Sequence, residues 1–314
     1  MKELYLSEND GGQRLDKFLK KATVGLPDSL LYKYLRKKCV KVNGRHVTDG
    51  AHVLSAGDRL QLYMNEDFFV TLEESFRTLV PEITVAYEDE RLLVLFKEAG
   101  VSCHADDLQK ENTLIDRAKA YLFQKGDYRP DEEHAFAPAL ANRIDRNTAG
   151  LVLCAKDAET LRLLSELIRR HKVEKEYRAL VWGTPSPKKG TLTLYLKKDE
   201  REKRVRVFDN PVPGAKTAVT DYEVLCSDAE KSLLHIRLHT GRTHQIRASF
   251  AHIGHPLVGD GKYGVLHGRD NLGFSHQALL SYSVRFVVED AVHPLFYLNG
   301  KTVTAPEVDP VFRP

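Results

Sequence analysis

The sequence predicts an α+β protein in which a small basic N-terminal domain precedes a mixed, largely antiparallel sheet. Alternating apolar and polar residues, typical of half-buried strands, recur from about residue 83 onward. Few helical patterns separate these strands, so most neighbours in the sheet are expected to be antiparallel. Before them, residues 1–64 show two short amphipathic helices and a few short strands.

Residues 1–64 are expected to form one domain. Its first helix is predicted by Leu15, Phe18 and Leu19, which recur at the spacing of one helical face. Its strands are predicted by two short alternating runs, the first of which ends in Asn-Gly, a dipeptide typical of tight hairpin turns.

A second helix is predicted over residues 30–38, because the Leu-Pro-Asp-Ser sequence before it can cap a helix start. Its apolar residues fall on one side. The other side carries a basic stripe made of Lys33, Arg36 and Lys37. Such a stripe often does no more than keep a helix solvated, so it does not by itself establish a binding surface.

Residues 65–82 are acidic and poorly periodic, so we expect a linker there and a second domain over residues 83–314. Strand patterns in this domain lie at residues 91–96, 151–155, 177–182, 191–196, 217–226 and 233–238. Helices are expected near residues 113–123, 158–171 and 243–253. The charged run over residues 197–206 is typical of a solvated hairpin.

Composition argues against several classes of protein. No apolar run approaches the roughly 20 residues that cross a bilayer, and the N-terminus lacks signal-peptide features, so we expect a cytoplasmic protein with no membrane partner. The four cysteines lack any paired spacing, so neither a disulfide nor a thiolate metal site is expected. Four histidines cluster between residues 239 and 255, but no acidic or thiolate partners stand at ligand-like spacing, and no metal is expected.

Charge is unevenly distributed along the chain, although the net charge is only +3. Residues 1–64 carry 12 Lys and Arg against 7 Asp and Glu, residues 65–139 carry 8 against 17, and residues 140–314 carry 27 against 20. Two basic blocks therefore flank an acidic one. This pattern is typical of a protein that contacts a polyanion at two places.

The segment over residues 142–151, Asn-Arg-Ile-Asp-Arg-Asn-Thr-Ala-Gly-Leu, places one carboxylate, Asp145, between Arg143 and Arg146. From spacing alone, an Arg-x-Asp sequence is more often a structural ion pair or a turn than a catalytic site. From the sequence alone, Tyr177 is likewise more often a packed core residue than a catalytic one. Arg242 and Arg247 are more often solvent-exposed residues at the start of a basic helix.

Taken together, the motifs resemble those of the RluA-type pseudouridine synthases. Residues 142–151 are similar to the family's signature loop, commonly His-Arg-Leu-Asp-x-x-Thr-Ser-Gly-Leu, and residues 175–183 to the strand with its active-site tyrosine. Residues 238–247, followed by residues 254–260, are similar to its long basic motif. Residues 14–60 resemble the alpha-L RNA-binding domain that ribosomal protein S-four shares with many RNA-modifying enzymes.

The resemblance implies roles for individual residues. Asp145 would be the catalytic carboxylate, either as nucleophile or as a base that removes a sugar proton. Arg247 would pair with it, and Tyr177 would stack on uracil and assist proton removal. Arg143 would fill the space that a flipped base vacates, and Ile246 would pack against the base. Three basic residues of the first domain, Lys33, Arg36 and Lys37, with Arg242 in the second, would contact RNA.

The implied activity is isomerisation of uridine to pseudouridine in structured RNA. The branch that acts on large-subunit ribosomal RNA resembles this chain most, and transfer RNA is the alternative substrate. No atom enters or leaves in this reaction, so no cofactor is expected. We expect a monomer.

Departures from the family pattern lie mainly in the signature loop: Asn142 for His, Ile144 for Leu, and Ala149 for Ser. Leu280 and Ser281 stand where the family often has His-Ala, and His104 is a further candidate for the pocket wall. None of the departures removes the carboxylate, the tyrosine or the arginine, so they bear on loop detail and substrate identity.

Two other functions fit parts of the sequence. One is a non-catalytic RNA-binding protein on a lapsed enzyme scaffold, which the intact Asp145, Tyr177 and Arg247 argue against. The other is an RNA hydrolase, which usually needs a cluster of metal-binding carboxylates or paired histidines, and neither is visible in the sequence.

Overall fold

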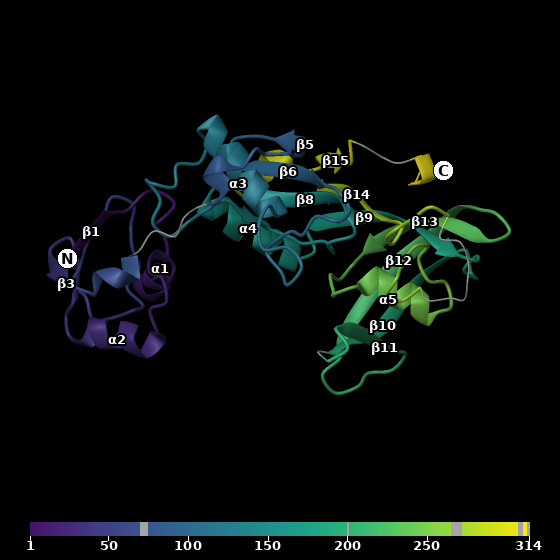
Figure 1. Cartoon of the computed structure of the whole chain (residues 1–314), viewed down its shortest axis with the longest axis horizontal. Coiled ribbons are helices and arrows are strands. Elements are labelled where there is room, and N and C mark those ends of the chain that lie inside the picture. The colour runs from purple at the N-terminus through teal and green to yellow at the C-terminus, as the bar shows by residue number, and fades with distance from the viewer. Residues whose placement is uncertain (70–74, 200, 265–271, 307–309, 313–314) are drawn as a thin grey trace. The chain divides into compact units, whose positions relative to one another are not determined.

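The structure is a computed structural model that describes residues 1–69, 75–199, 201–264, 272–306 and 310–312. The chain divides into two compact units, and Figure 1 shows their elements. The first unit comprises Met1–Glu82, Ile115–Ala139 and Ala155–Arg162. The second comprises Ile83–Leu114, Leu140–Cys154 and Leu163–Pro314.

The first unit contains a four-stranded antiparallel sheet with the order β1-β4-β2-β3. Its strands are β1 (Lys2–Tyr5), β2 (Val40–Val42), β3 (Arg45–His46) and β4 (Arg59–Leu62). Two predicted helices are present as α1 (Leu15–Ala22) and α2 (Asp28–Arg36), and the short turns η1 (Glu66–Phe69) and η2 (Ser75–Thr78) follow. Phe18 of α1 and Leu31 of α2 are fully buried in one core with the sheet, because each helix has a single apolar face.

The second unit is built on a large mixed sheet with the order β11-β10-β12-β13-β9-β14-β8-β6-β5. Two short strands lie off this path: β7 pairs with β8, and β15 pairs with β14. Its first strands are β5 (Thr84–Glu88), β6 (Leu92–Lys97), β7 (Ala139–Leu140), β8 (Ala149–Ala155) and β9 (Val173–Trp182). The later strands are β10 (Lys189–Asp199), β11 (Arg204–Phe208), β12 (Lys216–Ser227), β13 (Lys231–Leu238), β14 (Leu279–Phe286) and β15 (Thr302–Thr304). Most pairs are antiparallel, whereas β14 and β8 are parallel, so the predicted α+β class is confirmed.

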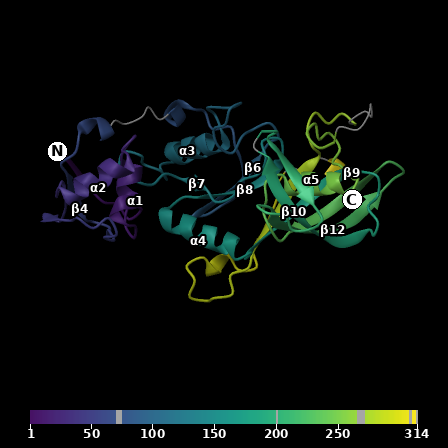
Figure 2. The ribbon, with the colours of Figure 1, turned by 90° about the horizontal axis from the view of Figure 1, so that it is seen from below.

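Three longer helices complete the chain: α3 (Leu114–Lys125) falls almost wholly in the first unit, α4 (Ala158–Arg169) is divided between the two units, and α5 (Gln245–His252) belongs to the second. Figure 2 shows α5 beside β10, and its Ala248 packs against Leu194 and Leu196 of that strand. Ile246 and Phe250 of α5 join the core over β9, β12 and β13. Two short turns, η3 (Phe296–Leu298) and η4 (Pro310–Phe312), lie near the C-terminus. In the part of the chain that the structure describes, no helix could cross a membrane.

Candidate active site

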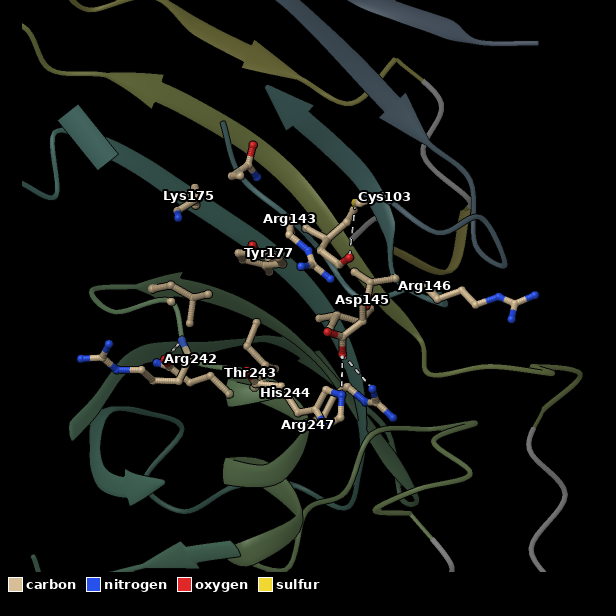
Figure 3. Close-up of a pocket in the computed structure, with 18 of the residues that line it drawn as sticks. Cys103, Arg143, Asp145, Arg146, Lys175, Tyr177, Arg242, Thr243, His244 and Arg247 are labelled. Carbon is tan, nitrogen blue, oxygen red and sulfur yellow. Dashed lines mark hydrogen bonds and ion pairs between the residues drawn. The ribbon is translucent and has the colours of Figure 1, made fainter. Parts of the chain in front are cut away.

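A cavity of about 1170 Å³ lies in the second unit. Its wall comes from the loop before β8, the start of β9, the loop before α5, and residues that follow α5. Asp145, Tyr177 and Arg247 all line this cavity (Figure 3). The fold therefore brings the three expected catalytic residues to one cavity from three separate segments.

Hydrogen bonds fix the loop that carries Asp145. The Thr148 N–H donates to the Asp145 carbonyl at 3.0 Å and closes a turn. The side-chain oxygen of Asn142 accepts the Leu153 N–H at 2.8 Å and so joins the start of the loop to β8. Asn142, where the family commonly has His, thus has a structural role here.

Lys97, at the end of β6, supports the same loop from a buried position. Its ammonium donates to the carbonyls of Glu98, Val101 and Arg146 at 2.8, 2.8 and 2.7 Å. Gly100 also bonds Arg146 twice, accepting from its Nε and donating to its carbonyl. Burial lowers the pKa of Lys97 to about 8, so the ammonium remains the main form at neutral pH.

The strand after the loop approaches β14 very closely. A Cβ atom on Gly150 would lie 2.2 Å from the carbonyl oxygen of Ser281, and the φ of Gly150 is +119°. Only glycine accommodates both the contact and the backbone angle. Gly150 therefore lets β8 pair with β14 and fixes where the Asp145 loop ends.

Arg247 connects two carboxylates. Its Nη1 donates to Asp145 Oδ2 at 2.7 Å, and its Nε and Nη2 donate to Asp260 Oδ2 and Oδ1 at 2.7 and 2.9 Å. Arg247 lies in the first turn of α5, which begins at Gln245. The ion pair between Arg247 and Asp145 that the resemblance implied is present in the structure.

Asp260 holds the guanidinium in a buried environment. The side chains of Asp260 and Arg247 are 0% and 9% exposed, whereas that of Asp145 is 27% exposed. Burial acts to raise the pKa of Asp260, but the hydrogen bonds and charge of Arg247 outweigh it and keep that pKa below its usual range. The Asp260 carboxylate therefore orients Arg247, and Arg247 in turn orients Asp145.

The two oxygens of Asp145 have different surroundings. Oδ2 accepts from Arg247 and also lies 3.8 Å from Nε2 of His244. Among the described residues, Oδ1 has no hydrogen-bond partner. Oδ1 is therefore the oxygen that is free to act on a ligand in the cavity.

Tyr177 lies on β9 and is 7% exposed. Burial raises its pKa to about 12, so its phenol is neutral at physiological pH. Ser281 lies directly opposite on β14, and the nearby hydroxyl of Ser281 acts against that rise in the pKa of Tyr177. Ser281, one of the departures from the family pattern, therefore contacts a residue expected to act on the base.

His244 is held between Tyr263 and Asp145. The Tyr263 hydroxyl accepts the Val205 N–H at 2.9 Å and lies 2.8 Å from Nδ1 of His244. If the hydroxyl proton points to Nδ1, the imidazole carries its own proton on Nε2, which faces Asp145. Burial lowers the pKa of His244 and so favours the neutral ring.

The structure divides the other expected residues between the two units. Arg143, Arg242 and Ile246 line the cavity, as does His104, and Figure 3 shows Arg143 between Tyr177 and Asp145. The basic stripe belongs to the first unit, where its three residues are exposed: Lys33 and Arg36 in the C-terminal half of α2 and Lys37 directly after it. The cavity and the basic stripe are therefore separate features of the chain.

Reasoning from sequence gave no role to Asp260, His244 or Lys97. Asp260 and His244 lie inside matched motifs, so their positions were visible although their partners were not. A lysine at the end of the apolar run of β6 was the only signal for Lys97. Within the described residues, no group of three or more His, Cys, Asp or Glu could hold a metal ion.

Comparison with known proteins gives a consistent assignment. Residues 91–252 match the family model for RNA pseudouridylate synthase, and residues 13–60 match the S4 domain. An uncharacterised RNA pseudouridine synthase of Mycoplasma pneumoniae is 34% identical over 88% of this chain and 86% of its own length. Ribosomal large subunit pseudouridine synthase C of Vibrio cholerae is 32% identical over 82% of this chain and 79% of its own length.

The fold is also similar to that of a solved structure. The solved structure is that of human RNA Pseudouridylate Synthase Domain Containing 1. The match covers 75% of this chain and 88% of the human chain, with a TM-score of 0.56 and 21% sequence identity. At this identity the likeness concerns the fold alone. The two family matches and the bacterial relatives carry the assignment: this chain belongs to the RNA pseudouridylate synthase family and is an RNA pseudouridine synthase with an N-terminal S4 domain.

Proposed function

We propose that this enzyme isomerises selected uridines of large-subunit ribosomal RNA, with Asp145 as the reacting carboxylate. The observation that carries the proposal is the pairing of Asp145 with Arg247 in the cavity, which leaves Oδ1 unbound among the described residues. The similarity to the Vibrio cholerae enzyme supports large-subunit RNA as substrate. Because Asp145, Tyr177 and Arg247 line one cavity, the geometry supports catalysis over the non-catalytic alternative.

One carboxylate can serve the whole reaction. The glycosidic bond of uridine must break, the base must rotate, and ring carbon five must bond to the sugar. Asp145 can assist either as a nucleophile at the anomeric carbon or as a base that takes a sugar proton. Both roles require an ionised carboxylate in a fixed orientation, and the guanidinium of Arg247 holds Asp145 Oδ2 at 2.7 Å.

The target uridine has to leave its stacked position to reach Asp145, at a cost of a few kcal/mol. We propose that Arg143 occupies the vacated space, and that the uracil lies between Tyr177 and Ile246. Arg143 is exposed and points toward the cavity, whereas Tyr177 and Ile246 are buried in its wall, which suits these roles.

We propose that residues 1–64 bind RNA, that residues 83–314 catalyse the reaction, and that residues 65–82 link the two domains. The basic stripe is exposed, so its side chains are accessible to phosphates. Phosphate contacts add affinity but read no sequence. Arg242, on the cavity rim, is proposed to contact RNA near the target.

Mapping pseudouridines in total RNA from cells with and without this protein tests the proposal. The expected result is loss of one or more sites in large-subunit ribosomal RNA, restored by the wild-type gene. Loss confined to transfer RNA would contradict the assigned substrate, and no lost site in any RNA would contradict the function.

Changing Tyr177 to Phe should preserve RNA binding but slow conversion by about 100-fold or more, the scale of a lost acid or base group. The ring remains to stack on uracil, and only the hydroxyl is removed. Single-turnover measurements on a cognate RNA would check this. Ser281→Ala, which removes only the neighbour of the hydroxyl, is the control and should have a smaller effect. An unchanged rate in Tyr177→Phe would exclude a role for the hydroxyl.

Neutralising the basic stripe with Lys33→Gln, Arg36→Gln and Lys37→Gln should weaken RNA binding and reduce its salt dependence. Each lost phosphate contact should flatten the slope of log affinity against log salt by roughly 0.7 to 0.9. The rate at saturating RNA should change little, because no stripe residue lines the cavity.

A matched control changes the net charge equally within the second unit. Three lysines there are each paired with a carboxylate and lie outside the cavity wall: Lys172, Lys189 and Lys231. Changing all three to Gln should leave the slope near that of wild type. Equal slopes for the two triple variants would show that the stripe does not hold this RNA.

A further inference from the structure

Lys175 lies in the cavity wall but has no part in the chemistry described so far. It stands on β9 two residues before Tyr177, so the two side chains are on the same face of the strand. Figure 3 shows both side chains on this strand, with Tyr177 the nearer of the two to Arg143. Lys175 is half-buried and lines the cavity.

The ammonium of Lys175 has no partner among the described residues. Across the residues that the structure describes, Lys175 makes neither an ion pair nor a side-chain hydrogen bond. Burial lowers its pKa from the ordinary value, and no carboxylate acts against this effect. Lys97, the other lysine with a strongly buried amine in this region, is satisfied by three carbonyl oxygens.

The acidic residues in the cavity wall are already engaged. Asp145 pairs with Arg247, and Glu174 pairs with Arg237. Asp106 accepts bonds from the Ser102 hydroxyl and two main-chain N–H groups. Within the described part of the chain Lys175 is therefore without a counterion of its own.

An ammonium that loses water without gaining a partner destabilises the folded protein. A methionine of similar shape would avoid this cost at the same position. A group of this kind, facing a cavity, is typical of a residue whose partner arrives with the ligand. The missing partner must be an anion or a strong acceptor.

RNA supplies one anion per nucleotide, and the target nucleotide has a phosphodiester on each side of its sugar. The sugar must lie near Asp145 and the base near Tyr177, so a flanking phosphate has to lie within about one nucleotide of them. Two residues of extended strand, about 7 Å, separate Lys175 from Tyr177. This spacing suits a phosphate next to the base that Tyr177 contacts.

We propose that Lys175 binds a phosphodiester oxygen of the RNA backbone beside the target uridine and so helps to draw that nucleotide into the cavity. The proposal rests on the assignment of this cavity to the target uridine. It makes Lys175 a substrate-binding residue within the cavity, distinct from the basic stripe of the first unit.

The first test compares Lys175→Met with Lys97→Met. Lys175→Met should melt at the same temperature as wild type or higher, because it removes a charge that has no protein partner. Lys97→Met should melt at a clearly lower temperature, because the carbonyls of Glu98 and Val101 lose their Lys97 donor and that of Arg146 keeps only the Gly100 N–H. A structural role for Lys175 predicts instead that both variants lose stability.

The second test measures RNA binding at several salt concentrations. Lys175→Met should bind cognate RNA about tenfold more weakly, consistent with the loss of one charge-assisted hydrogen bond, and its salt slope should flatten by roughly 0.7 to 0.9. Its kcat/KM for that RNA should fall by about the same factor of ten, because at a given concentration less RNA has its target nucleotide in the cavity. Lys175→Arg, which keeps the charge, should restore most of the affinity.

The third test identifies the phosphate with RNAs that carry one neutral methylphosphonate near the target uridine. One such linkage should weaken binding by wild type and make no further difference to Lys175→Met. If no linkage within two nucleotides shows this coupling, or if Lys175→Met loses rate with an unchanged salt slope, the proposal is wrong. If wild type converts none of these RNAs in unmodified form, the proposed function fails instead.

Discussion

Replacing Asp145 with Asn is expected to abolish pseudouridine formation, with a loss of at least about 10³-fold, while RNA binding persists. Asn has nearly the same shape, and its carbonyl oxygen can still accept the hydrogen bond from Arg247. It has neither the nucleophilicity nor the basicity of the carboxylate. Single-turnover conversion and equilibrium binding of one cognate RNA would separate these two effects.

The matched control is Asp209→Asn, which makes the same chemical change at a carboxylate that pairs with His252 and lies outside the cavity wall. Its conversion rate should equal that of wild type. Residual turnover of Asp145→Asn within tenfold of wild type would refute the assignment of Asp145. Loss of RNA binding together with activity would mean that the carboxylate organises the site rather than reacting.

Replacing Asp260 with Asn should be the most destabilising single change near the site. It removes the charge that partners a guanidinium that is only 9% exposed, and breaking a buried pair from one side costs about 3–5 kcal/mol. The amide can also no longer accept from both Nε and Nη2 of Arg247. Urea denaturation would measure the stability loss. Conversion should also slow, because Arg247 no longer holds Asp145 in one orientation.

Asp228→Asn controls for the loss of one carboxylate charge. Asp228 pairs with Lys231 on the surface, where its side chain is 53% exposed, and such pairs contribute at most about 1 kcal/mol. Equal unfolding free energies for the two variants would show that Asp260 does not support the fold through Arg247. Rates should be compared well below the melting temperature of Asp260→Asn, so that unfolding does not imitate lost catalysis.

Local patterns in the sequence predicted most elements of the fold. The apolar periodicity of α1 and α4 and the alternation in β10, β12 and β13 depend on nearby residues, so they could be recognised without the structure. β14 was not predicted, although it lies between β9 and β8 in the sheet. Its place depends on the close approach of Gly150 to Ser281, which joins residues about 130 positions apart.

The same distinction applies to the site. The resemblance indicated that Asp145 and Arg247 form a pair, and no local pattern could have done so, since 102 positions separate them. The role of Asp260 depends on where the chain runs after α5, so its motif alone did not reveal it. Likewise, nothing in the sequence indicated that residues 115–139 would group with the N-terminal domain.

Lys97 and Gly100 contact the Asp145 loop largely through the main chain of Arg146, and main-chain atoms are the same for every amino acid. Substitutions within the loop can therefore alter its chemistry toward RNA without moving the carboxylate. Side chains of this loop that face RNA can therefore change during evolution while Lys97 and Gly100 hold its main chain in place. Libraries that vary Ile144 and Asn147 while keeping Lys97 and Arg143 should accordingly yield folded enzymes with altered target preference, which makes this loop a practical starting point for redirecting the enzyme to new uridines.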